Sequence, residues 1–249
     1  GMEVVQVQGL LIGTDGNGSD DAAEGNRFVA PSRTALALIG NNTAGNIVAG
    51  NRFGLAADGT TSLGLGFGIQ VRDGAHDNRI GGTGPLDGNR IVGPTGAGIQ
   101  NASGGSGNAL LGNTGRVTSS ALFIDLGPDG VTANDTHDAD TGPNDLQNFP
   151  VITYAVADGA AGQIRGTLQS EANRSYRIEI YGSDAASSSG SGLPHYLIGI
   201  VNVTTDAAGQ ASFNLAAGPT AAGHWVSATA TQANAGFTSF GSTSEFGAP

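Results

Sequence analysis

The feature that most constrains this chain is a Gly-Asn-apolar unit that recurs through the first 145 residues. It occurs at Gly25-Asn26-Arg27-Phe28, Gly45-Asn46-Ile47-Val48, Gly50-Asn51-Arg52-Phe53, Gly88-Asn89-Arg90-Ile91 and Gly107-Asn108-Ala109-Leu110, with Asp77-Asn78-Arg79-Ile80 as a variant. Short alternating stretches lie between these units, and taking Leu38, Ile69, Ile99 and Ile124 as equivalent gives offsets of 31, 30 and 25 residues. A period in this range predicts stacked units, none of which buries its apolar face alone.

The repeated unit has the character of β structure. Gly and Asn, which tolerate the left-handed backbone of sharp corners, interrupt every apolar stretch, and no stretch keeps a helical period for about ten residues. Coils of this length with two or three short strands each predict a right-handed parallel β-helix of four to five coils over residues 1–145, with neighbouring coils about 4.8 Å apart. Asn side chains at equivalent corners are expected to stack into hydrogen-bonded ladders.

The composition changes near residue 146. Residues 1–145 contain four aromatic side chains, all Phe, whereas residues 146–249 contain ten, including the single Trp. Alternating stretches separated by Gly, Asp and Ser turns predict about seven strands, and they cover residues 151–156, 163–168, 176–181, 197–205, 211–215, 225–231 and 237–246. This pattern predicts a second domain, a β-sandwich over residues 146–249, after a first domain that ends in an acidic linker.

Several segments resemble a known group of proteins. Ile12-Gly13-Thr14-Asp15, residues 53–60 and residues 77–82 look like the repeats of bacterial right-handed parallel β-helix surface proteins. Residues 124–127, Asn134-Asp135, residues 140–144 and Leu146-Gln147-Asn148-Phe149-Pro150 resemble the linker that precedes a C-terminal immunoglobulin-like module in that group. The resemblance implies a secreted or cell-surface origin and an immunoglobulin-like sandwich, and it implies no catalytic residues.

Charge and residue usage exclude several classes of function. The chain has no Cys, and its ten basic residues are all Arg against twenty-one acidic ones, for a net charge of −11. The absence of Cys and Lys excludes disulfides, thiol nucleophiles, zinc ribbons and P-loops. The negative charge argues against nucleic acid and anionic membranes as partners, and the longest apolar runs are too short for a membrane span, so no membrane insertion is expected.

Residues 125–145 form the densest polar segment, with six Asp and no Arg. Such carboxylates repel one another unless a cation neutralises them, and Ca²⁺ takes its ligands from Asp, Asn and carbonyl oxygens. We expect a calcium site with ligands from Asp129, Asp135, Asp138 and Asp140, which would brace the joint between the domains. The alternative is that these residues only form turns and satisfy loop amides.

No set of catalytic residues can be assembled from the sequence. Glycoside hydrolysis needs two carboxyl groups about 5–9.5 Å apart, and Asp20-Asp21 is the only adjacent pair, with Asp73 and Asp77 in another turn. A lyase would need a base such as Arg72, Arg79 or Arg90. His76, His137, His195 and His224 lack zinc-site spacing, whereas a Ser–His–Asp triad stays open because its members meet only in space. Tyr181, Tyr196 and Trp225 are candidates for stacking on sugars, although a lone Trp in a strand favours a place in the core.

These observations predict a non-catalytic fragment of a secreted or cell-surface bacterial protein with a structural, adhesive or carbohydrate-contacting role. The expected partners are polysaccharide or another surface protein. The alternative is a polysaccharide lyase or glycoside hydrolase that acts on the β-helix face. Residues 2–12 open directly on strand-like alternation, so we expect further coils upstream in the natural protein and self-association through the open end.

Overall fold

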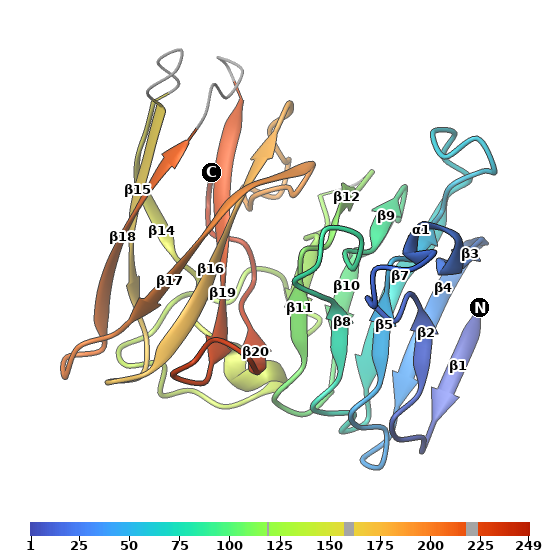
Figure 1. Ribbon diagram of the computed structural model, residues 1–249, viewed down its shortest axis with the longest axis horizontal. Helices are drawn as coiled ribbons and strands as arrows, with labels where there is room; N and C mark the ends of the chain where they lie inside the picture. The colour runs from blue at the N-terminus through green and yellow to red at the C-terminus, as the bar shows by residue number, and fades with distance from the viewer. Residues whose placement is uncertain (119, 157–161, 218–223) are drawn as a thin grey trace.

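The computed structural model describes residues 1–118, 120–156, 162–217 and 224–249 (Figure 1). Strands make up 46% of the described residues and helices 3%, which confirms an all-β protein with parallel sheets. The helical elements are α1 (Asp21–Glu24) and the 3-10 turn η1 (Pro143–Leu146). Within the described residues, no helix is long and apolar enough to cross a membrane.

Residues 1–126, here called the parallel region, form three parallel sheets. The long sheet contains β1 (Met2–Val5), β4 (Ala30–Ile39), β7 (Leu65–Arg72), β10 (Ile99–Asn101) and β13 (Ile124–Leu126). The second sheet contains β2 (Leu11–Gly13), β5 (Ile47–Ala49), β8 (Arg79–Gly81) and β11 (Ala109–Leu111). The third sheet contains β3 (Arg27–Phe28), β6 (Arg52–Phe53), β9 (Arg90–Val92) and β12 (Thr114–Arg116). The chain visits the sheets in turn, so each pass adds one strand to each sheet.

The register of the long sheet tests the proposed repeat directly. Ile69 pairs with Ile99 and Ile99 with Ile124, as predicted. The first equivalence was wrong, because Leu36 pairs with Ile69 while Leu38 pairs with Val71. A shift of two residues keeps the same face of a strand inward, so the apolar pattern alone does not distinguish the two registers.

The repeated Asn residues form two buried ladders at the corners of the parallel region. In the first, the amide of Asn46 donates to Asn78 and that of Asn78 to Asn108, at 2.9 and 3.0 Å. In the second, the side chains Asn26, Asn51, Asn89 and Asn113 are joined in the same way. Gly45 precedes the first ladder with a φ of 65°, and Asp77 takes the same left-handed conformation at 51°. Asp77 in the variant unit therefore forms the same corner as the Gly residue of the other units. The hydrogen bonds between the Asn side chains confirm the expected ladders.

Residues 151–243, here called the antiparallel region, form two antiparallel sheets. One contains β14 (Val151–Val156), β15 (Gly162–Gln169) and β18 (Gln210–Ala217). The other contains β17 (Tyr196–Thr204), β16 (Ser175–Ser183), β19 (Trp225–Ala233) and β20 (Phe240–Thr243). Their core is formed by apolar side chains of both sheets, among them Ile164, Tyr176, Ile178 and Phe213.

The antiparallel region lies against the last pass of the parallel region, beside β11 (Figure 1). Tyr181 and Phe246 belong to the core of the parallel region, where the ring of Phe246 packs edge-on against Phe123. Side chains also accept the backbone N–H groups at this end, because Leu110 donates to Thr243 Oγ1 and Gly112 to Glu179 Oε2, both at 2.8 Å. The antiparallel region therefore covers the C-terminal end of the stacked sheets.

The opposite end of the long sheet is formed by β1, the edge strand in the order of that sheet. The apolar side chains Met2, Val5, Val7 and Leu11 are exposed there. In contrast to the covered end, this edge has no neighbouring strand among the described residues.

Candidate functional site

The face of the long sheet opposite the core carries a row in which four of the five residues are polar. Equivalent register positions in its five strands hold Glu3, Ala37, Gln70, Gln100 and Asp125. The flanking residues Ile69 and Val71 are fully buried in the core. Alternation of the two faces of a strand thus directs one side-chain row outward from each coil at the same height.

Hydrogen bonds join the last three residues of this row, and Thr34 of β4 beside them, into a ladder. The Thr34 hydroxyl donates to Gln70 Oε1 at 2.7 Å, and Gln70 Nε2 donates to Gln100 Oε1 at 2.8 Å. Gln100 Nε2 then donates to Asp125 Oδ2 at 2.7 Å. Each amide uses one of its two N–H groups in the ladder. Gln70 is partly exposed, so its second N–H and a carbonyl lone pair are available to a ligand, whereas Gln100 is 8% exposed.

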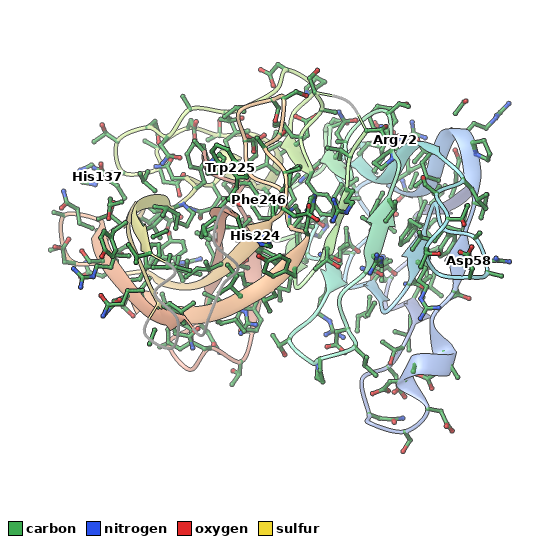
Figure 2. The ribbon with its side chains drawn as sticks, turned by 90° about the horizontal axis from the view of Figure 1, so that it is seen from above. Asp58, Arg72, His137, His224, Trp225 and Phe246 are labelled. Carbon is green, nitrogen blue, oxygen red and sulfur yellow. The ribbon has the colours of Figure 1, made fainter. Side chains whose placement is uncertain are left out.

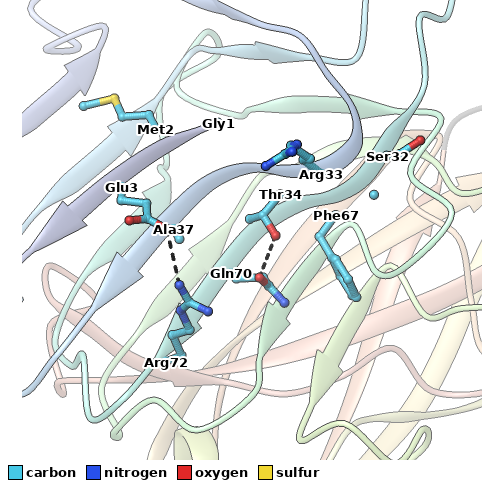
Figure 3. Close-up of a pocket in the computed structure, with 11 residues that line it drawn as sticks. Gly1, Met2, Glu3, Ser32, Arg33, Thr34, Ala37, Phe67, Gln70 and Arg72 are labelled. Carbon is cyan, nitrogen blue, oxygen red and sulfur yellow. Dashed lines mark hydrogen bonds and ion pairs between the residues drawn. The ribbon is translucent and has the colours of Figure 1, made fainter.

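A hollow of about 620 Å³ lies over the first three strands of this face (Figure 3). Its lining includes Glu3, Arg33, Gln70 and Arg72 from β1, β4 and β7. Arg72 and Glu3 form an exposed ion pair at 3.5 Å, whereas Arg33 forms no ion pair with another described residue. The hollow therefore combines two guanidinium groups, a carboxylate and the amide of Gln70.

A second hollow of about 350 Å³ lies over the later strands of the same face. Gln100 and Asp125 line it together with Leu122 and Val131. The ring of Phe67 lines both hollows, so the two adjoin on one face of the long sheet. A face of this kind offers hydrogen-bonding groups in a repeating row beside an aromatic ring.

Asp125 ends the ladder in a largely buried position. Burial raises the pKa of its carboxyl group, the hydrogen bond from Gln100 lowers it, and the charge of Asp129 raises it further. Its Oδ1 atom is buried and has no hydrogen-bond partner by distance and angle. The only other carboxylate in the row is Glu3 on β1, four strand spacings away, or about 19 Å.

The predicted calcium residues are only partly brought together. Asp135, Asp138 and Asp140 each offer a carboxylate oxygen, and these oxygens lie within 4.8 Å of one another. Burial raises the pKa of Asp138 to about 6, with smaller increases from Asp140 and Asp135. The three residues lie in the linker and contact the base of the antiparallel region, because Asp138 accepts a hydrogen bond from the hydroxyl of Ser170.

Asp129 lies apart from this group. Its charge acts on Asp125 and on the buried Glu245, whose pKa values it raises. The segment that follows β13 turns toward Glu245, since Thr132 donates its N–H to Glu245 Oε2 at 2.9 Å. Proximity in sequence placed Asp129 with the other three, but the fold directs it to the joint between the two regions.

The other candidate carboxylates and arginines are distributed over the parallel region. Asp21 belongs to α1 and accepts hydrogen bonds from Thr14 and the Gly18 amide. Asp77 pairs with His76 at 2.7 Å, and Arg79 pairs with Asp87 at 3.4 Å. In the described residues, these groups therefore serve turns and local ion pairs rather than one shared face.

One histidine does meet a serine and an aspartate. His195 Nδ1 lies 2.6 Å from Asp184 Oδ1 and 3.2 Å from Ser183 Oγ. A Ser–His–Asp triad requires the two partners on different ring nitrogens, whereas here Asp184 and Ser183 both lie nearer to Nδ1, and Ser183 Oγ is 3.5 Å from Nε2. Asp184 also forms a two-pronged ion pair with Arg116 of β12, so the cluster connects the two regions.

The aromatic candidates are placed differently from the expectation. Trp225 is 45% exposed at the start of β19, beside His224 (Figure 2), so its predicted place in the core was wrong. Tyr181 is buried instead, where its hydroxyl donates to Glu179 at 2.7 Å. Trp225 is the first residue of its strand, and a terminal position leaves the ring outside the layer of packed side chains.

The sequence interpretation missed the glutamine ladder. The signal was present in the recurring pairs Ile69-Gln70, Ile99-Gln100 and Ile124-Asp125, one in each coil. The second residue of each pair is polar, and this repetition predicts a polar row on the outer face of the sheet. The sequence around the buried Glu179 and Glu245 has no such repeated pattern, because the backbone N–H groups that donate hydrogen bonds to them are distant in sequence.

No protein-family profile matches this sequence, and comparison with curated proteins finds no match either. Function is therefore inferred from the residues themselves.

Proposed function

We propose that this chain is a non-catalytic part of a secreted or cell-surface bacterial protein whose long sheet contacts an extended carbohydrate. In this proposal the parallel region is a right-handed parallel β-helix and the antiparallel region an immunoglobulin-like sandwich. The strand counts of five, four and four in the three parallel sheets support a helix of four to five coils.

The observation that carries the proposal is the ladder from Thr34 through Gln70 and Gln100 to Asp125 along two adjoining hollows. Sugars are recognised by planar amides and carboxylates that hold hydroxyl groups and by aromatic rings that pack on their apolar faces. The ladder supplies the first kind of group at a constant interval, and Phe67 supplies the second. Hydrogen-bonding groups at a regular interval can contact successive units of a polymer, such as the sugar units of a polysaccharide.

The spacing of the carboxylates favours binding over hydrolysis. The two carboxylates of the row, Glu3 and Asp125, are about 19 Å apart. Hydrolysis of a glycosidic bond needs two carboxyl groups about 5–9.5 Å apart. Arg33 and Arg72 add positive charge to one hollow, which favours chains that contain uronate units.

The test is a glycan array with the whole chain, followed by calorimetry on the best ligand. Gln70→Ala removes one rung of the ladder, and we expect it to weaken binding at least tenfold. Gln163→Ala changes a Gln on β15 of the antiparallel region, and it serves as the matched control with unchanged affinity.

The same ligands are assayed for reducing ends and for unsaturated products. Binding without turnover, weakened by Gln70→Ala alone, is the expected result. Turnover that disappears when one Asp or Arg is replaced would establish the alternative, a lyase or hydrolase. Binding that is equal in both variants would contradict the assignment to the long sheet.

A further inference from the structure

We propose that Asp135, Asp138 and Asp140, together with the amide oxygen of Gln147, form a calcium site that holds the linker against the antiparallel region. The proposal is independent of the carbohydrate face, because it concerns a different segment and a different ligand.

The first support is the geometry of the three carboxylates. Their ligand oxygens lie within 4.8 Å of one another, and none of the three forms an ion pair with another described residue. Oxygens on opposite sides of a Ca²⁺ ion lie about 4.6–5.2 Å apart, since each is about 2.3–2.6 Å from the metal. The group can thus surround this ion without a large rearrangement.

The second support is independent of the carboxylates. Gln147 is 2% exposed, and its Oε1 atom is buried without any hydrogen-bond partner. Its amide lies directly against the cluster, because Nε2 donates to Asp138 Oδ2 at 2.6 Å. Buried polar atoms normally have partners, so an unpartnered amide oxygen on a side chain that contacts the acidic cluster through Nε2 points to a cation that it would bind.

Asp140 also has a carboxylate oxygen that lacks a hydrogen-bond partner. This atom, Oδ1, is buried as well. By contrast, the other two carboxylates are fixed by the loop, since Asp138 Oδ1 accepts the Asn148 N–H at 2.9 Å and Asp135 accepts the N–H of Ala139. The loop therefore positions two carboxylates and leaves two further oxygens free.

The donor set indicates which metal fits. All four groups are oxygen donors, and the described residues of the site include neither Cys nor a His ligand. Hard oxygen ligands favour Ca²⁺ or Mg²⁺ over zinc and copper, and a site of several carboxylates with variable spacing favours Ca²⁺. Mg²⁺ demands a smaller and stricter octahedral shell.

A second acidic group provides a contrast. Asp15, Asp21 and Glu24 also bring their oxygens within 4.8 Å. They lie near the surface around α1, and Asp21 and Glu24 already accept hydrogen bonds from Thr14, Gly18 and Asp15. No orphaned buried atom of the described residues lies among them, so this group carries no metal assignment and serves as a control.

Metal binding at the site can be measured by the luminescence of Tb³⁺, which occupies calcium sites and emits when a nearby tyrosine is excited. The Tyr176 hydroxyl lies 2.7 Å from Ser170 Oγ, which in turn donates to Asp138. We expect Tb³⁺ emission on tyrosine excitation, its loss when Ca²⁺ is added, and a higher melting temperature in millimolar Ca²⁺ than in EDTA.

Asp140→Asn is the test variant, because the amide has nearly the same shape and Oδ1 makes no hydrogen bond to lose. It should melt in EDTA as the unmodified chain does, and it should lose both the Tb³⁺ signal and the effect of Ca²⁺. Asp129→Asn and Asp21→Asn should keep both. Equal melting temperatures in Ca²⁺ and EDTA, an unchanged response in Asp140→Asn, or an equal effect of Mg²⁺ would each overturn the proposal.

Discussion

The backbone N–H of Leu126 donates a 2.8 Å hydrogen bond to Oε1 of Glu245, although 119 residues separate the two in sequence. The second oxygen of the same carboxyl accepts the N–H of Thr132 at 2.9 Å. One buried side chain near the C-terminus thus satisfies the last strand of the long sheet and the segment that follows it. The joint between the two regions depends on this group.

The stability of the protein is expected to decrease as the pH rises through the range in which Glu245 ionises. Burial raises its pKa to about 7 from an ordinary value of 4.5. Between these values the folded state holds a proton that the unfolded chain has released, so the free energy of unfolding falls with increasing pH. The contribution is on the order of 3 kcal/mol.

Urea denaturation between pH 5 and pH 8, a range of about the width that this shift implies, measures the effect. Glu245→Gln should reduce the dependence on pH, because an amide does not titrate there. Glu3→Gln, at an exposed position, should keep it. The same slope in Glu245→Gln and in the unmodified chain would contradict this assignment.

Glu179 is expected to be among the most sensitive positions for stability. It is fully buried and accepts hydrogen bonds from the N–H of Gly112, Nε of Arg177 and the hydroxyl of Tyr181. Glu179→Ala leaves the Arg177 charge without its buried partner, which costs about 3–5 kcal/mol.

Equilibrium denaturation checks this value. The control is Glu171→Ala, since Glu171 forms an exposed pair with Arg174 at 3.9 Å and should cost at most about 1 kcal/mol. Similar decreases in the free energy of unfolding in both variants would contradict the prediction that burial makes Glu179 more sensitive to substitution.

The Asn ladders are expected to contribute strongly to the parallel region. Asn78 donates to Thr43 and Asn108 and accepts from Asn46, and all of these bonds are buried. Asn78→Ala leaves several buried polar groups unsatisfied, at about 1–3 kcal/mol each. The free energy of unfolding should therefore fall by about 3 kcal/mol or more, whereas the exposed Asn42→Ala should change it by less than about 0.5 kcal/mol.

The exposure of Trp225 can be tested by fluorescence. As the single Trp of the chain, it reports its own surroundings without interference. Acrylamide should quench its emission in the folded protein nearly as well as in urea. Trp225→Phe should change the stability by no more than about 0.5 kcal/mol. Strong protection from quenching would restore the core position that the sequence had favoured.

Much of the parallel region could be predicted because its information is local and repeated. The Gly-Asn units mark the corners, and the Ile69, Ile99 and Ile124 register follows from a constant spacing. The Leu36 register was missed by two residues, since a strand shows the same face at each second residue. Repetition fixes the period, but pairing energy and loop length fix the register.

The site and the joint were less predictable because they depend on contacts between distant segments. The linker brings Asp135, Asp138 and Asp140 together through local turns, which the sequence suggests. Asp129 instead lies near Asp125 and Glu245, a residue more than one hundred positions later, and its charge raises the pKa of both carboxyl groups. A composition of acidic residues predicts a polar segment, but only the tertiary fold decides which carboxylates meet.

The ladder on the long sheet also gives that face a direction. Gln100 turns its NH₂ group toward Asp125 Oδ2 and its carbonyl oxygen toward Gln70. Gln70 is oriented in the same way, with its NH₂ group toward Gln100 and its carbonyl oxygen toward Thr34, whose hydroxyl donates to it. All amides therefore point the same way, and a polymer with unlike ends would meet a surface that distinguishes its two orientations.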